Sequence, residues 1–408
     1  MRLTAGGLVE RASARLDERL STTSSRPFAL ALSGGGDSTA LALIAAAWAR
    51  RVGRKLLILN VDHRLQPASA DWTRACAAFA QRLGADFEAL VWDGPKPQTG
   101  LPAAARTARH RLLADAARAA GARILLLGHT ADDVLEAQLM RAAGSTTPDP
   151  RPWSPSPAWP EGRGLHILRP LLDAGREAVR DFLRGEGEAW IDDPANLDLS
   201  YARPRARAAP AVHVVGATPV TPETPPAFAV DRAGVVILAR AQIDAAFLAR
   251  AVVCAGGGAR LPSRARLSAL AARLAGDDAV TATLAGASVV AAGESVQILR
   301  EPGESARGGL APVRIEARAV AVWDGRFEIH AGAEAVEVRG LGGASTALTR
   351  AERETLRAWS PRARRGLPLI SVDNAAGSLL APPPGVTVRE LVGERLSAAC
   401  GLVEREAD

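Results

Sequence analysis

The first half of the chain alternates between short apolar runs and longer segments whose apolar residues recur at helical spacing. The apolar runs predict buried strands at residues 28–32, 56–61, 87–92 and 123–127. The segments between them predict helices near residues 38–51, 71–84, 101–120 and 131–143. Strands that are apolar throughout and separated by helices are typical of a parallel sheet covered on both faces. The sequence therefore predicts a doubly wound α/β domain.

The second half of the chain has a less regular pattern. A proline-rich run at residues 147–162, which includes Trp153 and Trp159, cannot continue a helix and predicts an exposed insertion. A further run, GATPVTPETPP at residues 216–226, is typical of a linker between domains. After it, a helical segment near residues 240–275 precedes short alternating runs that predict strands. This half is predicted to be a smaller α+β region.

These changes of pattern divide the chain into four predicted segments. A first domain spans residues 1–215, a proline-rich linker 216–228, a helical or α+β middle domain 229–310, and an α+β carboxyl-terminal domain 311–408. A chain of 408 residues accommodates two or three domains at a prior of ~150 residues each. The number of segments and the length of the chain therefore agree.

The composition is that of an ordinary globular protein, with 48% hydrophobic and 23% charged residues. The longest apolar stretch, residues 40–49, is far shorter than the ~20 residues of a membrane span. No secretory signal is visible near the amino terminus. The cysteines Cys76, Cys254 and Cys400 are too few and too scattered for a disulfide framework or a CxxC site. We expect a cytoplasmic protein with no membrane partner.

The formal net charge is +6, and the basic residues are almost all arginine, since Lys55 and Lys96 are the only lysines. Arginine makes bidentate contacts to phosphate and stacks on bases, which favours an anionic partner such as RNA. A genome whose base composition favours arginine codons explains the same bias. The charge alone therefore leaves both interpretations open.

A glycine-rich loop stands at the end of the first predicted strand, where SGGGDS occupies residues 33–38 and a predicted helix follows directly. Three glycines let the backbone turn sharply and point N–H groups at an anion, and the helix adds its positive N-terminal end. No lysine follows, so this is not a Walker A loop. A phosphate held there needs Mg²⁺ to balance its charge, and Asp37 is the nearest oxygen ligand. The alternative is a plain turn with Asp37 or Ser38 as the helix cap.

This loop resembles the SGGxDS pyrophosphate loop of the N-type ATP pyrophosphatase superfamily. Four further stretches resemble, in order, the HVDHGL, GHHxDDQxET, xLxRPLL and DxSNxDxxYxRN segments of tRNA(Ile)-lysidine synthetases. They read NVDHRL at residues 60–65, GHTADDVLEA at 128–137, HILRPLL at 166–172, and DDPAN at 192–196 continuing to YAR at 201–203. Residues 25–210 are thus identified as similar to this family.

The resemblance implies the activity of a ligase that forms a carbon–nitrogen bond. ATP adenylates the C2 oxygen of the wobble cytidine in an isoleucine tRNA with a CAU anticodon, and the ε-amino group of free L-lysine then displaces AMP. The products are lysidine, AMP and pyrophosphate, and the cofactors are ATP and Mg²⁺. The resemblance also implies that residues 1–215 are an ATP pyrophosphatase-like catalytic domain and that 229–310 bind tRNA. It leaves the oligomeric state open.

The resemblance also implies site residues. The ATP-binding residues are Ser33, Gly34, Gly35, Gly36, Asp37, Ser38, Asp62 and His63, with Asp37 as the metal ligand. The substrate-binding residues are Arg106, Arg109, His129, Asp132, Asp133, Glu136, Asp193, Asn196, Arg203 and Arg207. Catalytic roles fall to Asp37, Asp132 and Glu136, and Glu136 is the foremost lysine ligand. In a helix, positions three and four apart share a face, which places Glu136 beside both Asp132 and Asp133.

Each of these assignments has a structural alternative. The acidic cluster is explained equally by helix capping and dipole compensation, Asp62 and His63 by a polar strand end, and the arginines by solvated charge. The chain also departs from the family pattern at Pro102, His110, Val134, Ala137 and Pro204, and a Pro/Trp-rich run replaces the segment after the acidic helix. These departures concern the details around the substrate more than the loop at residues 33–38.

Two other functions compete with lysidine synthesis. A tRNA thiolase of the same superfamily relies on reactive cysteines, whereas Cys76 lies on a predicted helix and is expected to be an inert core residue. A tRNA-binding protein with a decayed catalytic loop is disfavoured by the intact Ser33, Asp37 and acidic cluster. A basic cluster near the carboxyl end is expected to contact the tRNA backbone: Arg350, Arg353, Arg357, Arg362, Arg364 and Arg365.

Overall fold

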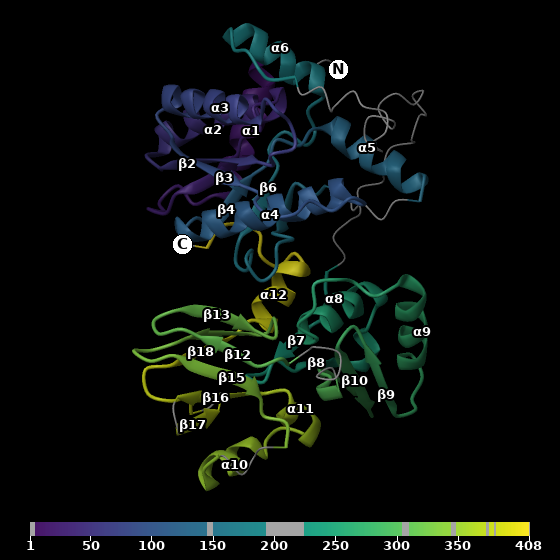
Figure 1. Ribbon diagram of the computed structural model, residues 1–408. Coiled ribbons are helices and arrows are strands. Elements are labelled where there is room, and N and C mark those ends of the chain that lie inside the picture. Colours follow the sequence, from purple (N-terminus) through teal and green to yellow (C-terminus); the bar gives the residue numbers. More distant parts are fainter. Residues whose placement is uncertain are drawn as a thin grey trace. The chain divides into compact units, whose positions relative to one another are not determined.

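The computed structural model describes residues 5–144, 150–192, 224–303, 310–343, 348–372, 375–378 and 381–407. Its contacts divide the chain into two compact units (Figure 1). Unit 1 comprises Met1–Thr221 together with Val403–Asp408, and unit 2 comprises Pro222–Leu402. The end of the chain therefore belongs to unit 1, whereas the sequence pattern groups it with the carboxyl-terminal domain. No described helix is long and apolar enough to cross a membrane.

Unit 1 is built on a six-stranded sheet in the order β3-β2-β1-β4-β6-β5. The strands are parallel except for β5, which pairs antiparallel with β6. Their bounds are Phe28–Ala31 (β1), Leu56–Asp62 (β2), Asp86–Val91 (β3), Ile124–Leu126 (β4), Trp153–Pro155 (β5) and His166–Leu168 (β6). The prediction of a doubly wound α/β domain is confirmed, and each of the four predicted strands is present.

Helices cover both faces of this sheet. Alternate residues of each strand point to opposite faces, so each strand contributes to a core on either side. Phe28 and Leu30 of β1 pack into one core with α1, α2, α3 and α6, whereas Ala29 packs into a second core with α4. Figure 1 shows these helices in purple to teal around the sheet. The bounds are Ala5–Arg19 (α1), Gly36–Val52 (α2), Ser69–Leu83 (α3), Leu101–Ala119 (α4), Ala131–Ala142 (α5) and Arg176–Glu186 (α6).

The strand order reverses at β1, whose two neighbours are β2 and β4. In doubly wound sheets ligands bind at such a reversal, beyond the carboxyl ends of the strands. The segments that follow β1 and β4 come very close together here. A Cβ atom added to Gly128 would lie 2.9 Å from the backbone oxygen of Asp37, so only glycine fits. The topology thus brings the loop at residues 33–38 beside the segment that begins with Gly128.

The proline-rich insertion is part of the sheet rather than an exposed loop. Its described residues supply the edge strand β5, and Ala158 is buried in the core beneath α4. The indole of Trp153 stacks on the His166 ring, with 4.8 Å between centroids, and donates from Nε1 to the Val403 oxygen at 2.7 Å. The prediction of an exposed insertion is therefore wrong for this part. The prolines end the helix pattern, as expected, but an edge strand tolerates them.

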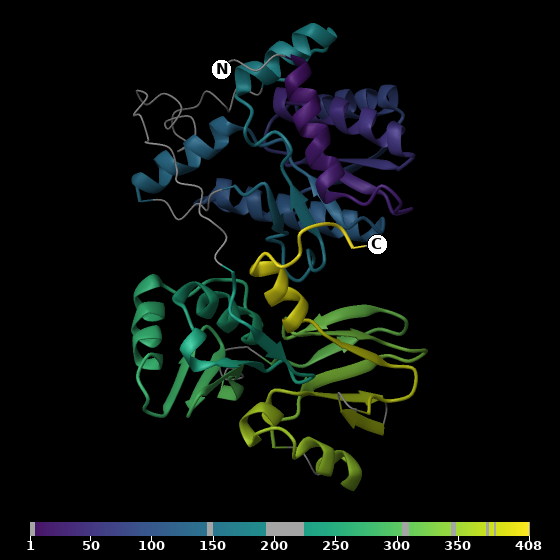
Figure 2. The same cartoon turned by 180° about the vertical axis from the view of Figure 1, so that it is seen from behind.

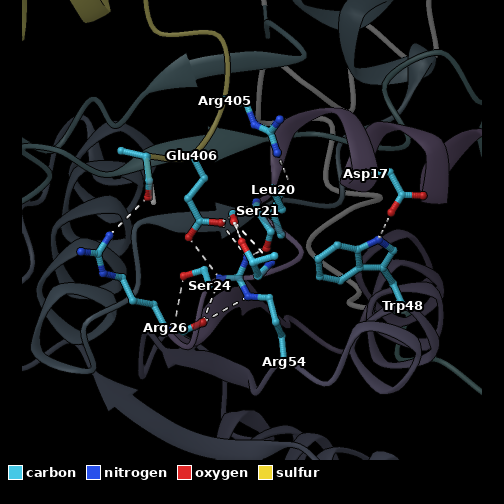
Figure 3. A network of polar contacts seen from close by, with 11 residues as sticks. Asp17, Leu20, Ser21, Ser24, Arg26, Trp48, Arg54, Arg405 and Glu406 are labelled. Carbon is cyan, nitrogen blue, oxygen red and sulfur yellow. Dashed lines mark hydrogen bonds and ion pairs between the residues drawn. The ribbon is translucent and has the colours of Figure 1, made fainter.

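The carboxyl-terminal end of the chain is anchored in unit 1 by a network of polar contacts (Figure 3). The Arg54 guanidinium donates to both carboxylate oxygens of Glu406, at 2.6 and 3.1 Å, and the Ser21 N–H donates to the same carboxylate. Arg19 donates to the Glu404 carbonyl at 2.6 Å, and its own carbonyl accepts from the Glu406 N–H at 2.8 Å. Figure 2 shows this end, in yellow, lying against unit 1.

The described residues of unit 2 form three antiparallel sheets, with strand orders β7-β8-β11-β10-β9, β12-β15-β16-β17 and β13-β14-β18. The strands of the first sheet are Phe228–Val230, Val236–Ala239, Val280–Leu284, Ala287–Ala292 and Ser295–Arg300 (β7 to β11). Those of the other two are Val313–Ile315, Val320–Trp323, Phe327–His330, Val336–Gly340, Pro368–Val372, Ala375–Ser378 and Thr387–Glu390 (β12 to β18). The prediction of an α+β region is consistent with this arrangement.

The helical elements of unit 2 are η2 (Arg240–Gln242), α8 (Ala245–Ala255), α9 (Arg264–Leu274), α10 (Arg350–Leu356), α11 (Pro361–Arg365) and α12 (Val392–Ala399). The helical segment predicted near residues 240–275 is divided into α8 and α9. Glycines at 256–258 separate them, and Gly257 has φ +69°, which ends α8. The predicted boundary near residue 310 and most of the predicted linker remain predictions, since 193–223 and 304–309 lie outside the described residues.

Candidate active site

The loop at residues 33–38 has a backbone shape that its glycines and hydroxyls define. Gly34 has φ +82°, and a Cβ there would lie 2.5 Å from Cδ1 of Ile191. The Ser38 hydroxyl donates to the Gly35 carbonyl at 2.9 Å and lies 3.1 Å from the Ser33 hydroxyl. Hydrogen bonds of its own side chains therefore hold the loop, and an alanine at Gly34 would be strained by the positive φ and would require the Ile191 side chain to move.

This loop leads directly into α2, whose first residue is Gly36. The first N–H groups of a helix lack partners within the helix, and they carry the positive end of its dipole. Both features make the beginning of α2 suited to a phosphate group. Asp37 lies in the first turn of α2, and its pKa is raised to about 6. Burial is the largest cause and the neighbouring Asp133 and Asp132 add to it, while Arg176 opposes them.

At the end of β4, Thr130 and Asp133 form a capping box at the start of α5. The Thr130 N–H donates to the Asp133 carboxylate at 2.9 Å. The carboxylate of Asp132 accepts from the backbone N–H of Arg176 at 2.7 Å, which joins α5 to the start of α6. Helix capping, the structural alternative for the acidic cluster, therefore accounts for these two hydrogen bonds, while the Asp133 carboxylate also lies 4.0 Å from the Arg176 guanidinium.

Glu136 makes a different contact. Its side chain is 4% exposed, and Oε1 lies 3.3 Å from both terminal nitrogens of Arg176. The same guanidinium lies 3.5 Å from the Asp37 carboxylate. Arg176 thus connects the phosphate loop to the acidic helix, and its positive charge stabilises Asp37, Asp133 and Glu136, which would otherwise repel one another. Local sequence does not distinguish Arg176 from the many other arginines of the chain.

A second group of predicted residues lies at the carboxyl ends of β2 and β3. The Asp62 carboxylate accepts from the Arg64 N–H at 2.7 Å, and the His63 ring contacts Trp92 edge to face at 5.9 Å. The Lys96 ammonium lies 3.7 Å from the centre of the Trp92 ring. Burial lowers the pKa of His63, and the nearby positive charge of Arg109 on α4 lowers it further. His63 is therefore a neutral ring at neutral pH.

A third group is cationic and surrounds His110. The pKa of His110 is lowered to about 2. Burial is the largest cause, and the positive charges of Arg109, Arg106 and Arg169 add to it. Burial is the largest cause of the lowered pKa of Arg169, about 10, and the positive charge of Arg106 contributes to it. Arginines that are close enough to repel each other are typical of a site that binds a polyanion. Phosphate oxygens accept hydrogen bonds from several guanidinium groups and compensate their repulsion. Arg169 is a second residue that the sequence analysis missed, although the xLxRPLL motif contains it.

The remaining predicted residues are placed differently. Asp193, Asn196, Arg203 and Arg207 lie outside the described residues. Among the residues that are described, no three His, Cys, Asp or Glu side chains gather as a metal site. The cysteines are not activated, because burial raises the pKa of Cys76 and Cys254 to about 11 and also raises the pKa of Cys400. A mechanism that relies on a reactive thiolate therefore has no support in these residues.

Comparison with known proteins decides between the remaining interpretations. The family described as PP-loop domain matches residues 8–211. A tRNA(Ile)-lysidine synthase of Caulobacter vibrioides is 48% identical over 98% of this chain and 99% of its own length. This chain belongs to the tRNA(Ile)-lysidine synthase family. The resemblance found in the sequence motifs is thus confirmed over the whole chain.

Two further comparisons each cover a little less than half of the chain. A family member from Mesorhizobium japonicum is 44% identical over 44% of this chain and 41% of its own length. Among solved structures, the U34-tRNA thiolase NcsA of Methanococcus maripaludis is 15% identical, covers 49% of this chain and 71% of its own, and has a TM-score of 0.41. Membership of the PP-loop family implies ATP use. The similarity to the Caulobacter vibrioides protein covers 98% of the chain and therefore includes unit 2.

Proposed function

We propose that this chain uses ATP to attach L-lysine to C2 of the wobble cytidine in an isoleucine tRNA with a CAU anticodon. The observation that carries the proposal is the connection of the phosphate loop to the acidic helix, in which Arg176 contacts both Asp37 and Glu136. This contact would join the proposed ATP site to the proposed lysine site, in a chain that belongs to this family.

The first chemical step is adenylation of the tRNA. Oxygen O2 of the cytidine attacks the α-phosphorus of ATP, and the bond to pyrophosphate breaks. The loop at residues 33–38 and the beginning of α2 would hold the leaving pyrophosphate through backbone N–H groups. This step converts a poor leaving group on C2 into AMP.

Asp37 is the residue that would hold Mg²⁺. Magnesium sites in nucleotide enzymes commonly use one or two carboxylates, with phosphate oxygens and water as the other ligands. The donor set fits this pattern, because Asp37 is a carboxylate in the first turn of α2, beside the proposed phosphate site. When bound, the ion would neutralise the charge that develops on the phosphates.

The second step is attack by lysine. The ε-nitrogen of lysine forms a bond to C2, the C2–O bond breaks, and AMP leaves. The ammonium form of lysine needs negative partners when it leaves water, and Glu136 with Asp132 and Asp133 supplies them. The nitrogen must then lose its protons before and after attack, and these carboxylates or the phosphate of AMP would accept them. Binding lysine at Glu136 requires that its ammonium share this carboxylate with Arg176.

Unit 2 would bind the backbone of the tRNA. In unit 2 an open groove of about 760 Å³ is lined by residues that include Arg339, Arg362 and Arg365. Arg362 and Arg365 belong to the basic cluster that the sequence analysis selected, and both are exposed. Exposed arginines that line a groove are suited to phosphate contacts, which supply most of the affinity for nucleic acids.

The decisive experiment combines the purified protein with ATP, Mg²⁺, labelled L-lysine and individual tRNAs. We expect label to enter an isoleucine tRNA with a CAU anticodon and no other tRNA, with pyrophosphate released in equal amount. Release of pyrophosphate without lysine incorporation, together with incorporation of sulfur from a sulfur donor, would instead identify a thiolase. Binding of tRNA with no pyrophosphate release would identify a decayed enzyme.

A further inference from the structure

The proline-rich segment before β6 holds Arg169, a buried arginine of the xLxRPLL motif, at three points. The Arg169 N–H donates to the Pro152 carbonyl at 2.8 Å, which extends the pairing of β5 with β6. Its terminal nitrogen Nη1 donates to the Arg151 carbonyl at 2.7 Å and lies 3.3 Å from the Ser154 hydroxyl. Side chain and backbone are therefore both fixed by residues 151–154, a segment whose role the motifs leave unexplained.

The fourth contact of Arg169 is with a predicted substrate-binding residue. Its Nε donates to Nδ1 of His129 at 3.0 Å. A guanidinium group has only donors, so Nδ1 of His129 has to be the acceptor and cannot carry a proton. Burial lowers the pKa of Arg169 to about 10, which still leaves it charged at neutral pH. A neutral imidazole whose Nδ1 accepts a hydrogen bond carries its proton on Nε2.

We propose that Arg169 is a positioning residue, held by residues 151–154, which keeps His129 neutral with its proton on Nε2. His129 then serves the reaction as a hydrogen-bond donor and not as a general base. The positive charge of Arg169, in direct contact with the ring, acts in the same direction because it disfavours a protonated imidazole. The hydrogen bond from Nε2 of His129 would be accepted by an oxygen atom of the nucleotide substrates. Only this identity of the acceptor rests on the proposed function.

The proposal changes the proton balance of the second step. Because the unprotonated nitrogen of His129 is bound to Arg169, His129 does not take the proton that lysine loses, which leaves the carboxylates and the phosphate of AMP as the proposed acceptors. It also gives the Pro/Trp-rich segment a function. Without residues 151–154 the Arg169 side chain would lose the acceptors that orient its Nε toward His129.

The test is the tautomer of His129, measured by nitrogen NMR on the full chain labelled with ¹⁵N histidine, without substrates and at pH 7.5. The chain has six histidines, and His129→Asn identifies the resonances. In the wild-type protein we expect Nδ1 in the range of an unprotonated ring nitrogen and Nε2 in that of a protonated one. A ring protonated on Nδ1, or on both nitrogens, would overturn the proposal. This readout is independent of whether the chain makes lysidine.

Two variants test the role of Arg169. Arg169→Met should mix the two tautomers, while Arg169→Lys, which retains a cationic donor, should preserve the Nε2 form in most molecules. In the lysine incorporation assay, Arg169→Met should lower kcat about tenfold or more with little change in KM for lysine, and Arg169→Lys should recover part of it. An unchanged His129 spectrum in folded Arg169→Met would also refute the proposal. If that variant fails to fold, the wild-type and Arg169→Lys spectra decide.

Discussion

Arg54 and Glu406 are 352 residues apart in the sequence and form an ion pair of 2.6 Å, with side chains that are 1% and 0% exposed. Removing one partner from a buried pair leaves the other charge without compensation, which costs more than the pair itself contributes. The pair therefore makes the integrity of unit 1 depend on the last residues of the chain (Figure 3).

Glu406→Gln should destabilise unit 1 by about 3 kcal/mol, because the Arg54 guanidinium stays buried without its counter-charge. Urea denaturation measures the loss, and hydrogen exchange of peptides from residues 16–31 assigns it to unit 1. Glu404→Gln is the matched control, since that side chain is exposed and its carbonyl makes the contact with Arg19. Equal stability of the two variants would show that the ion pair contributes nothing.

Asp37→Asn should reduce tRNA-dependent pyrophosphate release at least 100-fold, a barrier increase of ~2.7 kcal/mol, because the amide cannot hold a divalent cation against the phosphates. Affinity for tRNA, measured by filter binding, should stay within twofold. Asp173→Asn, which removes a partly exposed carboxylate elsewhere in unit 1, should retain full activity. Wild-type turnover in Asp37→Asn would refute the metal-binding role.

Glu136→Gln keeps the shape of the side chain and removes its charge. KM for lysine should rise tenfold or more, equivalent to ~1.4 kcal/mol, while adenylation of tRNA without lysine continues. The measurement is labelled lysine incorporation at varied lysine, with Glu177→Gln, an exposed glutamate at the start of α6, as control. Loss of adenylation would assign Glu136 to ATP and metal instead, and a change in thermal stability alone would leave it as a structural residue.

The buried His110 should make unit 1 sensitive to acid. Its pKa is lowered from 6.5 to about 2 by burial and by neighbouring arginines, so between these values the unfolded chain binds a proton that the folded chain does not. Stability is then lost as pH falls below 6.5, by about 2 kcal/mol between pH 7 and pH 5. His110→Phe should remove this part of the pH dependence in urea denaturation at the two values. His330→Gln, an exposed change in unit 2, should leave it intact.

Arg362→Ala with Arg365→Ala should weaken tRNA binding and reduce the slope of log affinity against log salt by about 1 for each lost phosphate contact. Titrations at 50 to 200 mM salt measure both quantities. Arg74→Ala with Arg82→Ala removes the same charge from α3 and should have little effect. A truncation after residue 226 is a poorer experiment, because it also deletes Glu406 and so disturbs unit 1. If both double variants behave alike, the groove in unit 2 is not a tRNA site.

Local patterns predicted much of unit 1 correctly. The four strands and four helices follow from apolar spacing, because a parallel sheet covered on both faces imposes a pattern that repeats within a few residues. The phosphate loop also follows, since Gly34 must adopt a positive φ at the turn into α2. Capping of α5 by Thr130 and Asp133 is likewise a local property of adjacent residues.

The sequence by itself determined the α/β class, the phosphate loop and the motifs of the family, all of which depend on residues close together in the chain. Only the tertiary structure selected Arg176 and Arg169 among many arginines, because their partners Glu136 and His129 are 40 residues away. It also decided that the proline-rich segment pairs as an edge strand and that Glu406 meets Arg54. Contacts between distant residues depend on how the elements pack, and no local spacing records that packing.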